Sequence, residues 1–275
     1  MRLFKEWLIR SYYLLAGFIY LFKAPVSRVL VYHVLDDRSV HLFEENIIYL
    51  LRKGYRFVTA REFGRLLTVK SLTANMRICA ITFDDGFKSV YTKALPILKK
   101  YRIPATVFIN LDLHRLHDNP KGTELMAEKI FPRLYKRHKD LIGLSKQEIV
   151  DLIDNGIEIG GHTITHPDLG RTTNYFLELA GPVQFFSSAF NYHIKTFAYP
   201  YGRKHNYTDE VIQELRDCGY EYAFLGISAD PQYSLWDKPY ELPRTSVPDG
   251  FRGGKFHSLL AGSQDLLDRI LNQKQ

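Results

Sequence analysis

Short apolar runs alternate with amphipathic segments along most of this 275-residue chain. The runs RVLVYHV (28–34), RICAITF (77–83) and PATVFIN (104–110) are almost continuously apolar, which is typical of strands buried on both faces. The segments 39–54 and 89–101 between them have the spacing of amphipathic helices. Because neighbouring parallel strands need a long crossover, usually a helix, this order predicts an α/β domain with a parallel sheet covered by helices.

The same alternation continues toward the C-terminus. Further strands are predicted at 55–59, 156–161, 194–200 and 220–226, and further helices at 60–67, 145–156, 173–192 and 207–219. About seven or eight such units favour one closed or partly closed barrel as a single domain. A basic segment after residue 110 interrupts the pattern, and its part from His114 to Lys139 is either a surface lid or a contact for substrate phosphates.

The N-terminal segment differs from the rest of the chain. Basic residues at Arg2, Lys5 and Arg10 precede an uncharged apolar run from Ser11 to Phe22. This run is shorter than the roughly 20 residues that a membrane-spanning helix needs. We expect residues 1–27 to form an apolar helix at a membrane interface, because aromatic side chains suit head-group depth; they are Trp7, Tyr12, Tyr13, Phe18, Tyr20 and Phe22.

Other interpretations of this segment stay open. It is also compatible with a helix packed on the core, an uncleaved signal anchor or an exported form. The expected localisation is therefore membrane-associated, on a side that the sequence does not indicate, with an exported or a soluble cytoplasmic protein as alternatives.

Net charge says little about the binding partners of this protein, and its two cysteines say little about its fold. The net charge of +7 and the pI of about 9.2 are compatible with an anionic partner, but a charge of this size is ordinary for a solvated surface. We expect no nucleic-acid partner. The two cysteines, Cys79 and Cys218, provide no disulfide framework, and Cys79 lies in an apolar run as a core thiol would.

Two histidines four residues apart, His162 and His166, are the first candidates for a functional site. Residues at this spacing share one face of a helix, but the three residues between them are β-branched, two glycines precede them and Pro167 follows. The pair therefore belongs to a loop that leaves the C-terminal end of a strand. Two histidines alone do not establish a metal site, which needs a further ligand.

Adjacent carboxylates follow another predicted strand, at Asp84 and Asp85 before Gly86. Alone, they are equally compatible with a turn that caps the next helix. Together with two imidazoles, one carboxylate completes the mixed oxygen and nitrogen shell of a catalytic metal site. The other carboxylate is then available as a general base, since neighbouring residues on extended backbone point in different directions.

Three motifs in this order resemble the signature of polysaccharide deacetylases, the carbohydrate esterase family 4 or NodB homology group. They are TFDDG (82–86), HTITH (162–166) and YPYG (199–202), and the resemblance covers roughly residues 28–250. It implies a deformed (β/α)7 barrel and metal-dependent removal of acetyl groups from N-acetylated sugars. We accordingly expect a deacetylase domain at 28–262, preceded by the helix at 1–27 and followed by a tail at 263–275.

The resemblance also implies roles for individual residues. Asp85, His162 and His166 would bind a divalent metal, most often zinc, with cobalt, nickel or manganese as alternatives. Asp84 would be the general base that deprotonates the metal-bound water. Thr163 would hold the loop by hydrogen bonding or face the substrate.

The third motif departs from the family pattern. Pro200 and Tyr201 would form one wall of the groove, with the Tyr201 backbone N–H facing the oxyanion. Many members have an arginine two residues before the proline to orient the catalytic aspartate, whereas this chain has Ala198. Arg244 is our candidate replacement, and a surface ion pair is the alternative role for it.

The general acid is expected to be a histidine. The late leucine-x-histidine motif of many members has no clean copy here, and His257 is a poor candidate. A second branch of the family takes this histidine from a first-strand YH motif, which this chain has at His33. An ordinary imidazole pKa near 6.5 suits proton donation at neutral pH, so we favour His33 over a histidine that is merely bonded to backbone.

The sequence therefore predicts a metal-dependent N-deacetylase that acts on an N-acetylhexosamine in a cell-surface polysaccharide or lipid-linked glycan. A deformylase or an O-deacetylase of a related glycan is an alternative, since the same chemistry would serve. A catalytically inactive carbohydrate-binding protein is another, although all expected site residues are present. The sequence does not indicate the sugar or the oligomeric state.

Overall fold

The computed structural model of the protein describes residues 19–20, 22–73, 75–138, 141–230 and 238–272. Most of the expected interfacial segment lies outside these ranges, including Trp7, Tyr12, Tyr13 and Phe18. Within them, no helix has both the length and the apolar character that crossing a membrane requires. The membrane-interface position and the domain limits therefore stay predictions.

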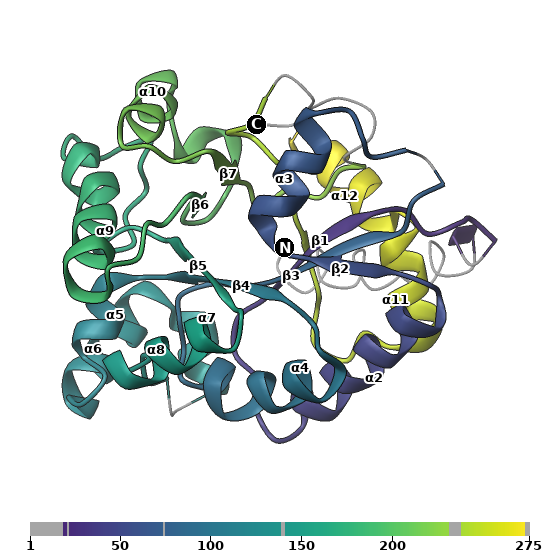
Figure 1. Cartoon of the computed structure of the whole chain (residues 1–275), viewed down its shortest axis with the longest axis horizontal. Helices are drawn as coiled ribbons and strands as arrows, with labels where there is room; N and C mark the ends of the chain where they lie inside the picture. The colour runs from purple at the N-terminus through teal and green to yellow at the C-terminus, as the bar shows by residue number, and fades with distance from the viewer. Residues whose placement is uncertain (1–18, 21, 74, 139–140, 231–237, 273–275) are drawn as a thin grey trace, which may run out of the picture.

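In the described part of the chain, eight parallel strands form one curled sheet (Figure 1). All paired strands run in the same direction, in the order β7-β6-β5-β4-β3-β1-β8, and β2 pairs with β3 beside β4. The apolar runs of the sequence become these strands, as predicted: β1 (Arg28–Tyr32), β2 (Arg56–Val58), β3 (Ile78–Phe83), β4 (Ala105–Ile109), β5 (Glu158–Gly161), β6 (Thr196–Ala198), β7 (Tyr222–Phe224) and β8 (Thr245–Ser246).

A short segment around β8 joins the two ends of the sheet. Leu242 forms a parallel bridge with Phe224 of β7, and three residues later Thr245 pairs with Leu30 of β1. One stretch of chain therefore contacts both outer strands, which curls the sheet into the partly closed barrel that the sequence predicts. The same stretch carries Arg244 into the barrel.

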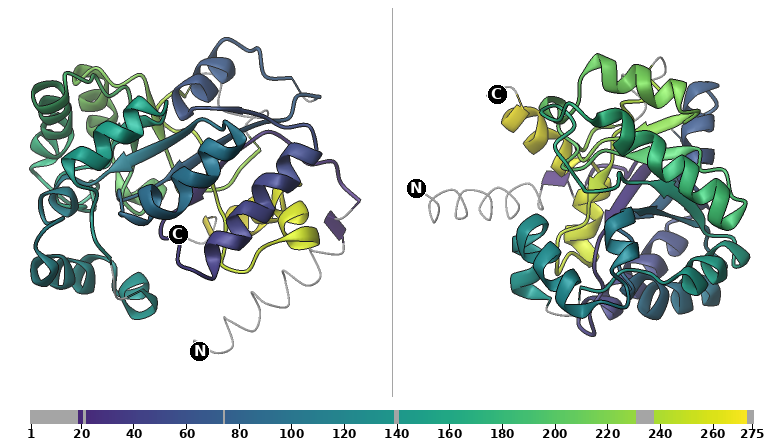
Figure 2. Two further views of the ribbon diagram at one scale, coloured as in Figure 1. Left: turned by 60° about the horizontal axis from the view of Figure 1, so that its bottom comes forward. Right: turned by 90° about the vertical axis from the view of Figure 1, so that its left-hand side faces the viewer.

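Helices cover the outer face of the sheet. Their positions follow the predicted amphipathic segments: α2 (Ser39–Arg52), α3 (Ala60–Thr68), η1 (Val90–Ala94) continuing into α4 (Leu95–Tyr101), α8 (Lys146–Asp154), α9 (Tyr175–Phe190) and α10 (Asp209–Asp217). The C-terminal helices are α11 (Gly253–Leu260) and α12 (Ser263–Asn272). Figures 1 and 2 show α11 beside α2, so the end of the chain returns to its beginning.

The basic interruption of the pattern contains three short helices that the sequence analysis did not predict. They are α5 (Leu111–Arg115), α6 (Pro120–Ile130) and α7 (Pro132–Arg137). Asn110 and Asn119 cap the first two by accepting hydrogen bonds from Leu113 and Gly122 backbone N–H groups. We call residues 110–138 the excursion; it packs on Phe87 through a small apolar cluster of its own.

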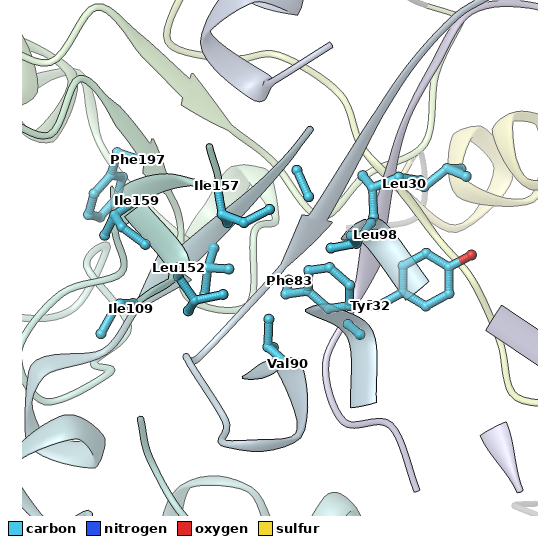
Figure 3. Packing of buried hydrophobic residues seen from close by; sticks show 14 of the residues in the cluster. Leu30, Tyr32, Phe83, Val90, Leu98, Ile109, Leu152, Ile157, Ile159 and Phe197 are labelled. Atoms are coloured by element: carbon cyan, nitrogen blue, oxygen red, sulfur yellow. The ribbon is translucent and has the colours of Figure 1, made fainter. Parts of the chain in front are cut away.

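Alternate residues of each strand enter two different cores. Tyr32, Phe83 and Ile109 face outward and pack with residues of the covering helices such as Leu152, as Figure 3 shows. Val29, three positions before Tyr32, and Phe108, one position before Ile109, face the barrel interior. The interior is filled by side chains, so a site can form only where the strands end.

Candidate active site

Seven of the nine residues predicted for the site line one cavity at the carboxyl ends of the strands, and Thr163 and Pro200 lie outside its lining. A cavity of about 420 Å³ opens there between β1, β3, β5 and the segment around β8. Asp84, Asp85, His162, His166, His33, Tyr201 and Arg244 line it. Thr163 lies behind this lining and is fully buried.

Asp85, His162 and His166 converge on one point in the cavity. Their candidate ligand atoms all lie within 4.8 Å of one another. The Nε2 atoms of His162 and His166 are 3.4 and 3.5 Å from Asp85 Oδ1. This oxygen is buried and makes no hydrogen bond within the described part of the chain. Buried polar atoms rarely stay without partners, so a set of carboxylate and imidazole donors in this state fits a bound metal ion.

The backbone orients one of these imidazoles. His162 Nδ1 lies 2.7 Å from the carbonyl oxygen of Ala198. Because a carbonyl only accepts, Nδ1 carries the proton and Nε2 keeps its lone pair for a ligand. Ala198, at the position where the family pattern led us to expect an arginine, thus contributes through its backbone carbonyl.

The histidine loop has an unusual backbone that Thr163 stabilises. Thr163 and His166 have φ values of 64° and 59°, in the left-handed region that branched residues rarely adopt. The Thr163 hydroxyl donates to the His162 carbonyl at 2.5 Å and accepts from the His166 N–H at 3.1 Å. Of the two roles expected for Thr163, the structure has the first: its hydroxyl holds the loop and does not face the cavity.

Glu178 holds the same loop from outside, and the sequence analysis missed it. This buried carboxylate in the first turn of α9 accepts hydrogen bonds from the backbone N–H groups of Ile164 (2.7 Å) and Thr165 (2.9 Å). Its other oxygen accepts from the Thr165 hydroxyl at 2.7 Å. Glu178 therefore fixes the residues between the two histidines and, with them, the separation of the imidazoles.

Arg244 forms a two-pronged ion pair with Asp84. Its two terminal nitrogens lie 2.6 and 2.8 Å from the two carboxylate oxygens, and its Nε donates to the Leu225 carbonyl. The guanidinium also lies over the Phe108 ring, 5.2 Å from its centroid. Arg244 is thus placed as predicted for a replacement of the missing arginine at Ala198, and it is not on the surface.

The pKa values of the site follow from these contacts. Burial alone would raise the pKa of Asp84, but the charges of Arg244 and His162 outweigh it and lower the pKa to about 2. Burial would also raise the pKa of Asp85. The contacts with His162 and His166 outweigh burial, so the pKa of Asp85 is lowered. For His166, burial dominates and lowers the pKa to about 4. Arg244 balances the charge of Asp84, so the ionised Asp85 between the two imidazoles is the carboxylate that can favour a bound cation.

Only one of the two candidate acids lies in the cavity. His33 follows β1 and lines the cavity wall on the side of Ser246. His257 lies on α11 and contacts the Tyr49 hydroxyl and the Lys23 carbonyl. Neither of these partners lines the cavity, so the geometry agrees with the choice of His33.

The excursion supplies an apolar wall that no motif indicated. Ile130, Phe131 and Pro132 line the cavity, and the Phe131 ring packs edge-on against His166, with ring centroids 4.9 Å apart. The Tyr201 ring contacts His166 from another side, with centroids 5.0 Å apart. Pro200 precedes it in the turn, where Tyr201 has a φ of 62°. Two aromatic side chains, Phe131 and Tyr201, thus flank the candidate ligand His166.

Comparison with known proteins agrees with this geometry. The family model described as polysaccharide deacetylase matches residues 72–223, more than half of the chain. The protein YxkH of Bacillus subtilis (strain 168), whose name places it among polysaccharide deacetylases, is 27% identical over 236 residues, covering 83% of this chain and 74% of YxkH. The poly-beta-1,6-N-acetyl-D-glucosamine N-deacetylase of Staphylococcus aureus (strain MSSA476) is 28% identical over 249 residues, covering 88% and 76%.

A solved structure extends the agreement to the fold. The Streptococcus pyogenes deacetylase PplD, in complex with acetate, matches with a TM-score of 0.66 at 20% identity, covering 89% of this chain and 97% of PplD. The deformed barrel expected from the sequence is therefore confirmed.

Proposed function

The chain belongs to the polysaccharide deacetylase family, and we propose that it hydrolyses the N-acetyl group of an N-acetylhexosamine in a cell-surface polysaccharide or lipid-linked glycan. The observation that carries this proposal is the juxtaposition of two unlike carboxylates in one cavity. Asp85 faces two imidazoles, whereas Asp84 faces a guanidinium. A relative named for N-deacetylation of poly-beta-1,6-N-acetyl-D-glucosamine supports the choice of an amide in a glycan.

Asp85, His162 and His166 would hold a divalent metal, and their mixed oxygen and nitrogen donors suit zinc. When bound, such an ion supplies Lewis acidity, which polarises a carbonyl and makes water more acidic. Cobalt, nickel or manganese could serve with the same donors. The side chains around the ligands then have to move protons and hold the substrate.

Asp84 would accept the proton of the attacking water. Arg244 binds both of its oxygens and keeps the carboxylate ionised, oriented and unable to coordinate in place of Asp85. His33, on the cavity wall, would donate a proton to the amine that leaves. Water adds to the acetyl carbon, the C–N bond breaks, and the products are acetate and a free amino sugar. The backbone N–H of Tyr201 is our candidate for stabilising the oxyanion.

Acetate release from N-acetylglucosamine oligomers tests this function. The zinc-loaded protein should release acetate, and Asp84→Asn should lower the rate by about 100-fold or more while zinc stays bound. Asp85→Ala should lose zinc itself, which elemental analysis after gel filtration measures. A wild-type protein that binds no divalent metal, or an Asp84→Asn protein with full activity, would contradict the proposal.

We also propose that residues 1–27 attach the protein to a membrane interface, on the strength of their aromatic and basic composition. Fractionation of cells that express the full chain or a chain lacking residues 1–27 tests this. The full chain should sediment with membranes and the shortened chain should not. Full-length protein in the soluble fraction would rule the attachment out.

A further inference from the structure

The three candidate metal ligands come from two loops that follow different strands. Asp85 follows β3, His162 and His166 follow β5, and β4 lies between these two strands in the sheet. The separation of the two loops therefore depends on the residue that comes directly after β4. This residue is Asn110, which is completely buried.

Asn110 contacts the backbone of both loops. Its backbone N–H donates to the carbonyl of Asp85 at 3.2 Å, and its side-chain amino group donates to the carbonyl of His162 at 3.3 Å. Its side-chain oxygen accepts from the Leu113 N–H at 3.0 Å and so caps α5. Because the amide nitrogen only donates and the oxygen only accepts, these bonds fix the orientation of the side chain.

The backbone that follows Asn110 continues the link to the histidine loop. The N–H of Leu111 donates to the Thr163 carbonyl at 3.2 Å, and the N–H of Asp112 donates to the Ile164 carbonyl at 3.0 Å. These are N–H groups of the first turn of α5, which have no partner within their own helix. The cap at Asn110 thus starts α5 where its free donors face the histidine loop.

The backbone of Asp85 needs support from its surroundings. Its φ of 70° lies in the left-handed region, which is unfavourable for a residue with a Cβ atom. Such a conformation persists where neighbouring groups fix it. The hydrogen bond from the Asn110 N–H to the Asp85 carbonyl is one of these contacts. Asn110 therefore restrains a ligand on each side of the site.

We propose that Asn110 is a positioning residue, which sets the separation of Asp85 and His162 and thereby the affinity of the site for a divalent metal. Asn110 does not line the cavity, so it would act through these ligands and not on the substrate. The inference rests on the proposed function, because it takes Asp85 and His162 to be metal ligands.

Two substitutions keep the helix cap and remove the donor. Asn110→Ser retains an oxygen that can cap α5 but has no amino group, and Asn110→Asp has the same shape with an oxygen in place of the nitrogen. The matched controls are Asn119→Ser and Asn119→Asp. Asn119 caps α6 by accepting from the Gly122 N–H, and its amino group bonds to no described residue.

Zinc affinity, measured by competition with a chromophoric chelator, is the main readout. It should fall by about 10–100-fold in both Asn110 variants and stay unchanged in both Asn119 variants. The visible absorption spectrum of the cobalt-loaded protein should change in the Asn110 variants alone, since it depends on the arrangement of the ligands. At saturating zinc, kcat on N-acetylglucosamine pentamer should fall about tenfold with KM unchanged, because the substrate contacts remain.

Wild-type zinc affinity and cobalt spectra in the Asn110 variants would limit Asn110 to capping α5 and overturn the inference, while the proposed function stands. Equal losses in the Asn119 variants would also overturn it, because the effect would then not depend on the donor to His162. Urea unfolding without metal shows whether each variant is folded at the assay temperature, and either Asn110 variant suffices. If the wild type binds no zinc, the proposed function itself fails and the inference with it.

Discussion

Asp84 and Glu158 lie at opposite ends of the same parallel sheet and have opposite electrostatic surroundings. Asp84 follows the carboxyl end of β3, whereas Glu158 is the first residue of β5. Burial raises the pKa of Glu158, and the hydroxyl groups of Thr106 and Thr196, both 2.8 Å away, do not compensate. At Asp84, Arg244 reverses the effect of burial and lowers the pKa to about 2.

The comparison shows what distinguishes the functional end of this barrel. Both carboxylates are enclosed and hydrogen-bonded, so neither enclosure nor hydrogen bonding separates them. The difference is a cation in direct contact: the guanidinium of Arg244 pairs with Asp84, whereas the hydrogen-bond donors to Glu158 are the Thr106 and Thr196 hydroxyls and the Arg61 backbone N–H. At the carboxyl ends of the strands, the ion pair with Arg244 keeps Asp84 ionised. At the amino ends, Glu158 links β5 to β4 and β6 through hydrogen bonds with Thr106 and Thr196.

The strongest test removes the cation. Arg244→Met leaves Asp84 enclosed without a charged partner, as Glu158 is, and should lower the free energy of unfolding by about 3–5 kcal/mol. Acetate release should fall by about 100-fold or more, because the base is neither oriented nor reliably ionised. Urea unfolding and acetate assays measure these effects.

The matched control is Arg61→Met, which breaks another two-pronged pair, with Glu221. These side chains are 52% and 37% exposed, so the loss should stay below about 1 kcal/mol. Equal losses in the two variants would show that burial of the Asp84 pair has no energetic consequence.

Stabilisation of the protein by zinc should depend on the carboxylate Asp85 and not on Glu158 at the opposite end of the sheet. At a free zinc concentration of about 100 times Kd, binding adds about 2.7 kcal/mol to the free energy of unfolding. Thermal unfolding with and without zinc should show this increment in the wild type and in Glu158→Gln, and Asp85→Ala should abolish it. An increment that survives Asp85→Ala would mean that zinc binds elsewhere.

Glu178 provides a third kind of enclosed carboxylate, one whose partners are backbone N–H groups. Glu178→Gln removes an acceptor from the loop between the histidines, so zinc affinity should fall by about 10–100-fold. Competition with a chromophoric chelator measures it. Glu210→Gln, an exposed glutamate in the first turn of α10, is the control and should bind zinc as the wild type does. Wild-type affinity in Glu178→Gln would limit Glu178 to a structural role.

The smallest effect is expected at Glu158. A carboxyl group whose pKa is raised by folding contributes most below its ordinary pKa of 4.5, and this contribution is lost as the pH rises through the folded-state value. Between pH 4 and pH 7, the free energy of unfolding of the wild type should therefore fall by about 1 kcal/mol relative to that of Glu158→Gln. Urea unfolding at several pH values measures it, and a change in the opposite direction would contradict the raised pKa.

The site residues that directly follow a strand could be predicted from the sequence. Asp84, Asp85 and the histidine pair follow strands directly, so the parallel sheet brings them together without further information. Arg244 was found only because Ala198 lacked the expected guanidinium and the buried Asp84 needed another. Strands and helices followed from apolar periodicity, since nearly every strand is buried on both faces.

Residues that act through tertiary contacts were missed. Glu178 reaches the histidine loop only because α9 packs across it, and a glutamate in the first turn of a helix is otherwise unremarkable. The wall made by Ile130, Phe131 and Pro132 depends on how the excursion folds back over the strand ends. Its helices did have a local signal, in the capping residues Asn110 and Asn119.

Residues 22–27 lead into β1 at the end of the barrel opposite to the candidate active site. Val26 bonds to the Leu260 carbonyl, and β1 begins two residues later, so residues 22–27 approach the amino ends of the strands. Asp84, Asp85 and the histidines all follow carboxyl ends. Attachment to a membrane through residues 1–27, as proposed, would turn the catalytic opening away from that membrane. Of the two substrates proposed, this orientation favours the polysaccharide over the lipid-linked glycan.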